Sequence, residues 1–411
     1  METKLKQYAE LVVKKGVNLK SGQTLVVRSP IECAPFTRAV VEKAYQAGAG
    51  DVVIAWSDEI CSKLNYTLAP ESSFDRVPSW LKELYLSTVR EDAAYISISA
   101  SDPEIMKDVN PERIKRYQRA YNREVSEYVD RLMSNENAWC VVSVPTVAWA
   151  QKVFPELSGD AAVNRLWEAI FEAVRMNEAD PVSAWDVHKK NLERRMNRLN
   201  AHQFSALHFS NSAGTDLTVG LPEGHIWLGG ADRTKSGHEF IANMPTEEVF
   251  TAPKRDGVNG RVVSALPLNL NGTLIEDFEF EFKDGRVIQV KARTGESHLK
   301  SLLETDDGAE YLGEVALVPY DSPISNSGIL FYNTLFDENA ACHLALGNAY
   351  PVCLKGAEGM DKETLRKHGI NTSIVHEDFM VGTSDMQIDG IESDGKKVPV
   401  FRNGNFVGEF E

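Results

Sequence analysis

Hydrophobic positions in the first half of the chain alternate between helical and strand spacing. Leu5, Tyr8, Leu11 and Val12 recur as the residues of one helix face do. Short apolar runs follow at residues 24–28 (TLVVR), 51–56 (DVVIAW), 94–100 (AYISISA) and 138–144 (AWCVVSV). Segments with helical spacing separate these runs. Because buried parallel strands read as near-continuous apolar runs joined by helices, the pattern predicts an α/β N-terminal domain with a mostly parallel sheet.

Such sheets often bind nucleotides through a glycine-rich loop after a strand. Neither GxGxxG nor GxxxxGK[ST] follows any of the predicted strands, and the first strand continues into RSPIECAPF, which contains no glycine. We therefore expect the first domain to be a scaffold without a cofactor loop. The basic helix at residues 188–200 (HKKNLERRMNRLN) is predicted to connect it to the second half.

From about residue 204 the pattern changes to short strands bounded by Gly, Asn and Asp. Residues 276–292 (EDFEFEFKDGRVIQVKA) alternate strictly on both sides of Asp284-Gly285, which indicates a β-hairpin. Phe278, Phe280 and Phe282 should share one face of it. We predict an α+β, β-rich and mostly antiparallel second half, with domain boundaries of 1–200 and 201–411.

Composition and charge narrow the classes of partner. The chain has 411 residues and a formal net charge of −16, so it should repel nucleic acid and anionic membranes. Its five cysteines include no CxxC pair, which disfavours a disulfide framework or a structural zinc knuckle. The charged N-terminus lacks a signal-peptide core, and no uncharged apolar stretch reaches about 18 residues. We expect a cytoplasmic protein without a membrane span.

Two segments of the second half place acids beside apolar strands. Glu247 and Glu248 lie in NMPTEEVFTAP (243–253), where an extended chain would point them to opposite faces. One could then bind a metal ion, and a charged turn is the alternative. Glu314 interrupts the apolar segment YLGEVALVP (311–319). A buried carboxylate is costly unless it is paired or metal-bound, although a solvent-facing edge position would also explain it.

Two further segments combine acids with histidines. Asp337, Glu338 and His343 fall in FDENAACHLALG (336–347), where ACHLALG is interpreted as a helix start, so that Glu338 and His343 converge across a loop-to-helix junction. The alternative is a helix-capping acid followed by an ordinary histidine. His376 and Asp378 lie two apart in the β-patterned SIVHEDFMVGT (373–383). They should share a face that Glu377 cannot join, unless the segment is simply a polar surface strand.

Together these segments supply four carboxylates and two histidines: Glu248, Glu314, Glu338, His343, His376 and Asp378. An oxygen-rich set of this kind suits two divalent ions that share a bridging carboxylate, whereas a single structural zinc more often uses Cys and His. The chain has neither the HExxH arrangement nor a serine elbow, so zincin and serine-hydrolase mechanisms have little support.

The motifs PTEEVFTAP, GEVALVP, FDENAACHLALGNAY and HEDFMVGT, in this order and spacing, resemble the thermophilic-type metalloaminopeptidases of the aminopeptidase T, aminopeptidase S and PepS group. The resemblance covers essentially the whole chain. It implies a β-rich C-terminal catalytic domain, peptide substrates, release of N-terminal amino acids, two divalent ions (zinc, cobalt or manganese) and a homodimer. It also implies that the six residues named above are the metal ligands, with Glu314 as the bridging and catalytic carboxylate and Tyr350 as the residue that stabilises the tetrahedral intermediate.

Two other functions stay open. A two-metal phosphoesterase or deaminase would need basic residues near the metals, and Lys254-Arg255 is the only basic pair that adjoins a candidate motif. A non-catalytic metal- or peptide-binding protein would use the same clusters structurally.

Overall fold

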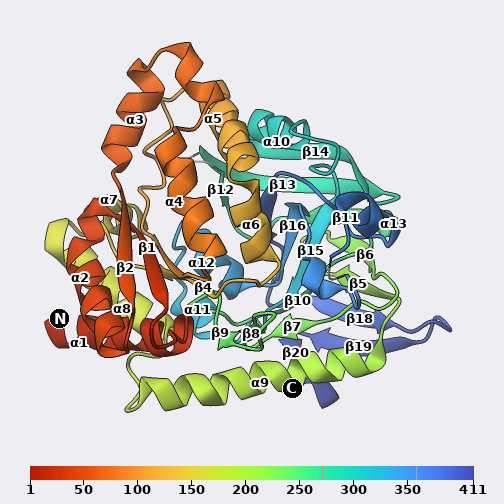
Figure 1. Cartoon of the computed structure of the whole chain (residues 1–411). Coiled ribbons are helices and arrows are strands. Elements are labelled where there is room, and N and C mark those ends of the chain that lie inside the picture. The colour runs from red at the N-terminus through yellow and green to blue at the C-terminus, as the bar shows by residue number, and fades with distance from the viewer. Residues whose placement is uncertain (271–272, 358) are drawn as a thin grey trace. The chain divides into compact units, whose positions relative to one another are not determined.

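The computed structural model describes residues 1–270, 273–357 and 359–411 (Figure 1). The chain forms two compact units, each discontinuous in sequence. The first contains Met1–Val187 and Ala231–Pro245, and the second contains His188–Gly230 and Thr246–Glu411. The division into 1–200 and 201–411 stays a prediction from the sequence. Among the described residues, no helix is long and apolar enough to cross a membrane.

The first unit is built on a four-stranded parallel sheet, which confirms the predicted α/β class. Its strands are β1 (Thr24–Pro30), β2 (Asp51–Ser57), β3 (Ala94–Ser99) and β4 (Trp139–Ser143), in the spatial order β2-β1-β3-β4. The helices are α1 (Glu2–Leu11), α2 (Ala34–Gln46), α3 (Glu59–Leu68), α4 (Ser79–Arg90), α5 (Pro111–Glu124), α6 (Ser126–Met133), α7 (Val147–Val153) and α8 (Gly159–Ala173). Two short strands, β8 (Asp232–Arg233) and β9 (Glu239–Phe240), complete the unit.

Helices cover both faces of this sheet because the path across the sheet reverses after the edge strand β2. The connection from β1 to β2 and the connection from β2 to β3 run opposite ways across the sheet, and right-handed crossovers therefore place α2 and α4 on opposite faces. Tyr128 of α6 packs on Tyr95 of β3 with ring centroids 5.2 Å apart, and Tyr85 of α4 packs on Tyr128 at 4.9 Å. Tyr8 of α1 packs on Phe36 of α2 at 5.0 Å.

The second unit is antiparallel and strand-rich, as predicted. One sheet of nine strands has the order β12-β13-β11-β6-β5-β18-β19-β20 with β14 beside β13, and a second sheet of five strands has the order β17-β16-β15-β10-β7. The strands are β5 (Ala206–Ser210), β6 (Asp216–Gly220), β7 (Leu228–Gly229), β10 (Val249–Thr251), β11 (Val258–Val263), β12 (Leu268–Leu270), β13 (Thr273–Lys283), β14 (Arg286–Thr294), β15 (Leu312–Leu317), β16 (His343–Gly347), β17 (His376–Met380), β18 (Gln387–Ile391), β19 (Lys397–Arg402) and β20 (Asn405–Phe406). The helices are α10 (Glu296–Leu303), α11 (Pro323–Ser327), α12 (Thr334–Asp337) and α13 (Lys362–Lys367), and α9 (Pro181–His202) contains the boundary between the units.

The predicted hairpin is present as β13 and β14. Asp284 and Gly285 adopt φ values of 50° and 82°, which a two-residue hairpin turn of the primed type requires. Phe278, Phe280 and Phe282 share one buried face, as the alternation predicts. They join a core to which Leu344 and Phe379 of the five-stranded sheet also belong.

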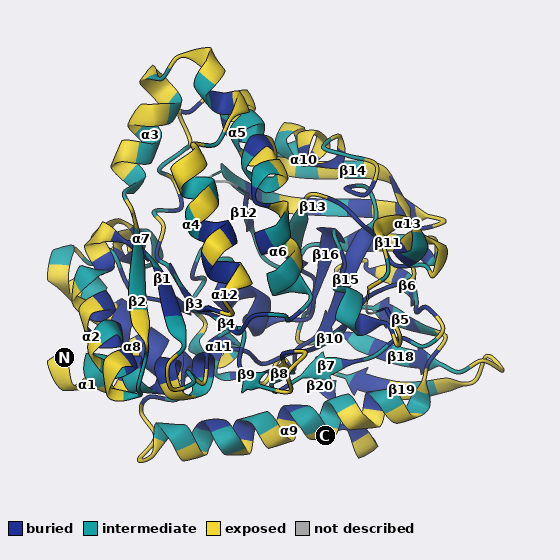
Figure 2. Ribbon diagram, in the orientation of Figure 1, coloured by how far each residue is buried: buried dark blue, intermediate teal, exposed yellow. Residues whose placement is uncertain are grey.

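The segment ACHLALG does not begin a helix, so that prediction is wrong. His343–Gly347 forms β16, which pairs with β15 on one side and β17 on the other. Every residue of this strand is buried, and Figure 2 shows β15 and β16 in dark blue. A central strand buried on both faces reads as a continuous apolar run, and sheet pairing overrides the helix propensity of Ala and Leu.

Candidate metal centre

Strand register brings the candidate residues of the second unit to one face of the five-stranded sheet. Glu314 on β15 lies opposite Ala345 on β16, and Ala345 lies opposite Asp378 on β17. His343 lies opposite Ala316 in the same way. Since directly opposed residues project to the same side of an antiparallel pair, these side chains form one cluster. The small alanines between them leave room for a ligand.

The other face of the same strands belongs to the hydrophobic core. Val315, Leu317, Leu344 and Phe379 are buried there. Glu377 lies opposite Leu346, on the face away from His376 and Asp378, as the alternation predicts. The alternating pattern of β15 thus explains how a single carboxylate can interrupt an apolar strand. Glu314 is buried, at 5% exposure, and it is not on a solvent-facing edge.

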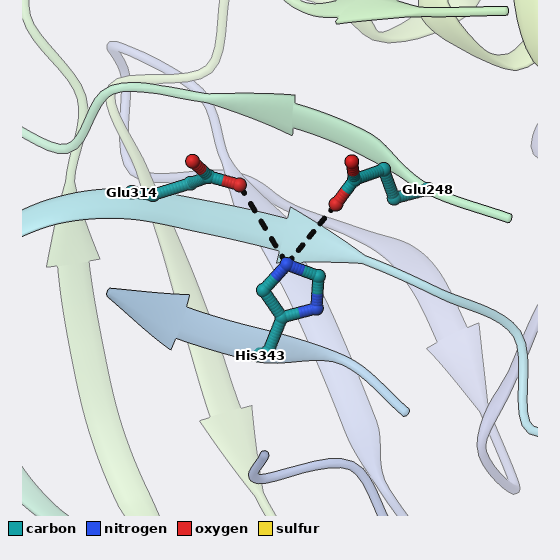
Figure 3. A group of neighbouring side chains, drawn as sticks. All are labelled: Glu248, Glu314 and His343. Carbon is teal, nitrogen blue, oxygen red and sulfur yellow. Dashed lines mark ion pairs between the residues drawn. The ribbon is translucent and has the colours of Figure 1, made fainter. Parts of the chain in front are cut away.

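The side chains form two groups that share Glu314. In the first, Glu248 Oε2 lies 3.0 Å and Glu314 Oε1 lies 3.6 Å from His343 Nε2 (Figure 3). In the second, Glu314 Oε2 and Asp378 Oδ1 each lie 3.5 Å from His376 Nε2. The ligand atoms within each group lie within 4.8 Å of one another. Glu314 therefore offers one oxygen to each group, which is the geometry of a bridging carboxylate.

Backbone carbonyls fix both imidazole rings. His376 Nδ1 lies 2.7 Å from the carbonyl oxygen of Asn348, and His343 Nδ1 lies 3.3 Å from that of Ala341. A carbonyl only accepts, so Nδ1–H must donate in each case. Nε2 therefore faces the carboxylates. It holds a proton while the ring is charged, and it offers a lone pair to a cation once that proton leaves. Metal-bound histidines are held in this way by a partner on the other ring nitrogen.

The cluster holds more negative charge than its hydrogen bonds satisfy. Burial and the neighbouring charges of Asp378 and Glu248 raise the pKa of Glu314 to about 7, although its contact with His343 acts in the opposite direction. Burial alone would lower the pKa of His376, but Asp378 and Glu314 outweigh it and raise that pKa to about 10. Glu248 Oε2 and Asp378 Oδ1 are buried, and apart from the histidine that each faces, no hydrogen-bond donor of the described residues reaches them. Each of these features favours a cation at the site.

Glu338 lies beside these groups without belonging to either. It starts the short 3₁₀ segment Glu338–Ala340 that leads into β16, and it is buried. Burial, followed by Asp378 and Glu248, raises its pKa well above the usual range of a glutamate. The preceding residue, Asp337, lies outside this cluster of charges and stabilises the loop. Asp337 accepts the backbone N–H groups of Phe331 and Asn333 at 2.9 and 3.0 Å, so it holds the loop in place.

Tyr350 reaches the cluster from the loop that follows β16. Its ring packs edge-on against His376, with centroids 5.4 Å apart, and against Phe250 at 5.7 Å. Burial and the charges of Glu314 and Asp378 raise the pKa of its phenol well above the usual value. The hydroxyl is therefore protonated and is available as a donor.

Glu247 and Glu248 have different partners, as expected for consecutive residues of an extended segment. Glu247 Oε2 lies 3.7 Å from His188 Nε2 on α9. Its backbone N–H donates to Asn339 Oδ1 at 2.7 Å, and Asn339 is completely buried. Asn339, which ties the Glu248 segment to the Glu338 segment, was not predicted from the sequence. A buried asparagine cannot be recognised from the sequence until its burial is known.

Comparison with known proteins places the chain in a family. Residues 1–406 match the family model described as "Thermophilic metalloprotease (M29)". The chain is 48% identical to aminopeptidase AmpS of Bacillus subtilis over 404 residues, and 44% identical to aminopeptidase T of Thermus thermophilus over 403 residues. Both alignments cover 98% of each protein. The solved structure of wild-type AmpT from Thermus thermophilus superposes with a TM-score of 0.91 at 43% identity, covering 99% of both chains. The full-length match and the shared fold establish that this chain belongs to the M29 family of metalloproteases and is a peptide-bond hydrolase.

Proposed function

We propose that this chain works as a metal-dependent aminopeptidase by holding two divalent ions on one face of its five-stranded sheet. Glu248, Glu314 and His343 would hold one ion, and Glu314, His376 and Asp378 would hold the other. The observation that carries the proposal is the position of Glu314, whose two carboxylate oxygens face one histidine each.

The residues fit such a pair of ions by charge and by donor type. Glu248, Glu314, Glu338 and Asp378 contribute a formal charge of −4 when ionised, and two divalent cations would balance it. The buried oxygens Glu248 Oε2 and Asp378 Oδ1, which have no other donor among the described residues than the histidine each faces, would become ligand atoms. Carboxylate and imidazole ligands suit zinc, cobalt and manganese. When bound, such ions polarise a scissile carbonyl and lower the pKa of a water molecule toward about 7.

Glu338 stays a proposed ligand, as the family resemblance implies. It is buried beside the two groups, and burial, Asp378 and Glu248 raise its pKa well above the usual range of a glutamate. A nearby cation would favour its ionised form. The transfer of a proton from water to the leaving amine would fall to a nearby carboxylate, Glu247 or Glu314.

Tyr350 would stabilise the negative charge that develops on the carbonyl oxygen. Its hydroxyl stays protonated in this surrounding and can donate a hydrogen bond. Removal of one such donor costs about 10²–10³-fold in rate in other hydrolases. The acidic cluster also attracts the positively charged α-amine that marks the N-terminus of a peptide. That attraction supports cleavage at the N-terminal residue.

The basic pair that a two-metal phosphoesterase could use for phosphate, Lys254-Arg255, has other partners in the structure. Lys254 pairs with Asp256 at 3.3 Å. Arg255 stacks on the Tyr311 ring at 3.6 Å and donates to Asn371. The only basic pair beside a candidate motif is thus engaged elsewhere.

An assay of metal dependence tests the function. The protein is stripped with a chelator, reconstituted with zinc, cobalt or manganese, and supplied with aminoacyl p-nitroanilides, the same compounds acetylated at the amine, and a phosphate monoester. We expect hydrolysis of the free-amine anilides alone, lost on chelation and restored by at least one metal. Hydrolysis of the phosphate monoester, or no peptidase activity with any metal, would overturn the proposal.

Two finer features are part of the same proposal. The family resemblance implies a homodimer, which light scattering of the purified protein would test. The described cysteines are all free, with four buried and Cys61 exposed, and this suits the reducing cytoplasm.

A further inference from the structure

The first unit contains a cavity that the metal centre does not use. It has a volume of about 460 Å³, within the range of small-molecule sites, and all of its lining residues lie between Arg28 and Val141. Its walls include the last residues of three neighbouring strands: Pro30 of β1, Ser57 of β2 and Ser99 of β3. The cavity therefore opens at the carboxyl edge of the parallel sheet.

This edge is where open α/β sheets bind ligands. The central strands β1 and β3 are neighbours; the connection that leaves β1 runs outward to β2, and the connection that leaves β3 runs the other way to β4, so the two lie on opposite faces. The reversal opens a crevice beyond the carboxyl ends of the two central strands, known as the topological switch point. Leu81 and Tyr85 of α4 form a further wall of the cavity at this position.

Arg28 supplies the only formal charge of the described cavity lining, which contains no Asp, Glu or Lys. Its guanidinium group stacks over the Tyr85 ring at 5.6 Å and donates to the Tyr128 hydroxyl in a long contact of 3.4 Å. No carboxylate of the described residues pairs with it. A guanidinium has five N–H donors, so most of them are left to meet water or a ligand. A half-buried arginine without an acidic partner, in a chain of net charge −16, favours an anion in this cavity.

The rest of the lining is apolar or hydroxylic. Trp56 and Trp80 are 43% and 69% exposed, and both line the cavity. Exposed tryptophans beside a pocket are typical of ligand sites, where they cover an apolar group. Ser29, Ser57 and Ser97 add hydroxyl groups nearby. The combination of one guanidinium with flat apolar walls selects a ligand that carries one negative charge and an apolar body.

We propose that this cavity binds the α-carboxylate and side chain of a hydrophobic amino acid, either free or at the C-terminus of a peptide. One guanidinium can bind a carboxylate through two parallel hydrogen bonds. A nucleotide fits less well, because no glycine-rich loop follows β1 and no second cation faces the cavity from its described lining. The described lining contains no acidic residue, which disfavours a metal cation. This proposal does not rest on the assignment of the metal centre.

Binding of N-acetyl-leucine to the full-length protein tests the proposal, with calorimetry and tryptophan fluorescence as readouts. The acetyl group blocks the amine, so an aminopeptidase cannot turn the probe over. N-acetyl-leucinamide has the same body without the charge, and N-acetyl-alanyl-leucine presents the carboxylate on a peptide. We expect the two acids to bind and the amide to bind about tenfold more weakly or worse. The relative affinity of the two acids tells which source the cavity prefers.

Variants separate this cavity from the metal centre. Arg28→Met keeps the length of the side chain and removes the charge, and we expect it to weaken binding of the acids about tenfold or more. Trp80→Ala removes an exposed ring and should weaken binding several-fold without loss of folding. Arg76→Met, at an exposed arginine outside the lining, is the matched control and should bind as the wild type does. Circular dichroism and thermal melting confirm that each variant is folded.

Three results would overturn the proposal. These are equal binding of the acid and the amide, wild-type affinity in both Arg28→Met and Trp80→Ala, and binding of inorganic phosphate in preference to N-acetyl-leucine. If Arg28→Met fails to fold, the decision rests on Trp80→Ala and on the comparison of acid with amide. Hydrolysis of aminoacyl anilides is measured on the same samples, so failure of this site is distinguishable from failure of the metal centre.

Discussion

Replacement of Glu314 by glutamine tests the central feature of the metal centre. Glutamine keeps the shape of the side chain but converts one of the two carboxylate oxygens into an amide NH₂, which cannot bind a cation. Because each oxygen of Glu314 faces a different histidine, His343 or His376, one of the two ligand groups must lose an atom. We expect Glu314→Gln to bind about one metal ion fewer per chain than the wild type.

The same change should have opposite effects on activity and on metal-free stability. In other metalloenzymes, loss of a residue that hydrogen-bonds to a metal ligand lowers metal affinity or activity about 10–100-fold. Loss of a ligand shared by both ions should therefore lower kcat at least about 100-fold. Burial raises the pKa of Glu314 from 4.5 to about 7. An acid whose pKa is raised by folding does not change the free energy of unfolding below about pH 4.5, because it is protonated in both the folded and the unfolded state. Above about pH 7 it lowers that free energy most, because the folded protein must then bury its charge. Above pH 7 the metal-free variant should be more stable than the metal-free wild type by roughly 3 kcal/mol.

The assay combines three measurements on one preparation: metal content, hydrolysis of an aminoacyl p-nitroanilide, and denaturant unfolding of the stripped protein at about pH 5 and about pH 8. Glu281→Gln, an exposed position on β13, is the matched control and should change none of them. Full activity with an unchanged metal content in Glu314→Gln would refute the bridging role. A stripped variant no more stable than the stripped wild type at about pH 8 would refute the electrostatic reasoning.

Three further predictions follow from other parts of the second unit. Tyr350→Phe should lower kcat about 10²–10³-fold with unchanged metal content, and a comparable change in KM alone would argue against an oxyanion role. Burial raises the pKa of Asp337 from 3.8 to about 7, so the ionised aspartate destabilises the fold as pH rises. The free energy of unfolding of Asp337→Asn should therefore rise relative to the wild type by roughly 3 kcal/mol between about pH 4 and about pH 7, and parallel pH profiles would contradict this. Gly285→Ala should destabilise the hairpin by more than about 1 kcal/mol, since its φ is 82° and a Cβ would lie 1.8 Å from the Arg255 carbonyl oxygen. Gly395→Ala, with a similar φ of 84° and open space around it, should cost less in the same denaturation experiment.

Local pattern predicted much of the fold. The four apolar runs of the first half became the parallel strands, and the alternation around Asp284-Gly285 became a hairpin, because both signals depend only on neighbouring residues. ACHLALG was misread as a helix because its apolar residues form a continuous run, and such a run has no period that distinguishes a buried strand from a helix. Only the pairing of β16 with β15 and β17 decided between them.

For the candidate site, too, some features follow from the sequence alone and others only from the tertiary structure. The sequence by itself supplied the residue types, the family resemblance, and the shared face of His376 and Asp378, since alternation along one strand is a local property. Tertiary structure decided that Glu314 and Asp378 flank Ala345 across three strands. It also decided that backbone carbonyls orient both histidines. Register between strands and the positions of carbonyl groups depend on contacts distant in sequence, and no pattern within a single segment encodes them.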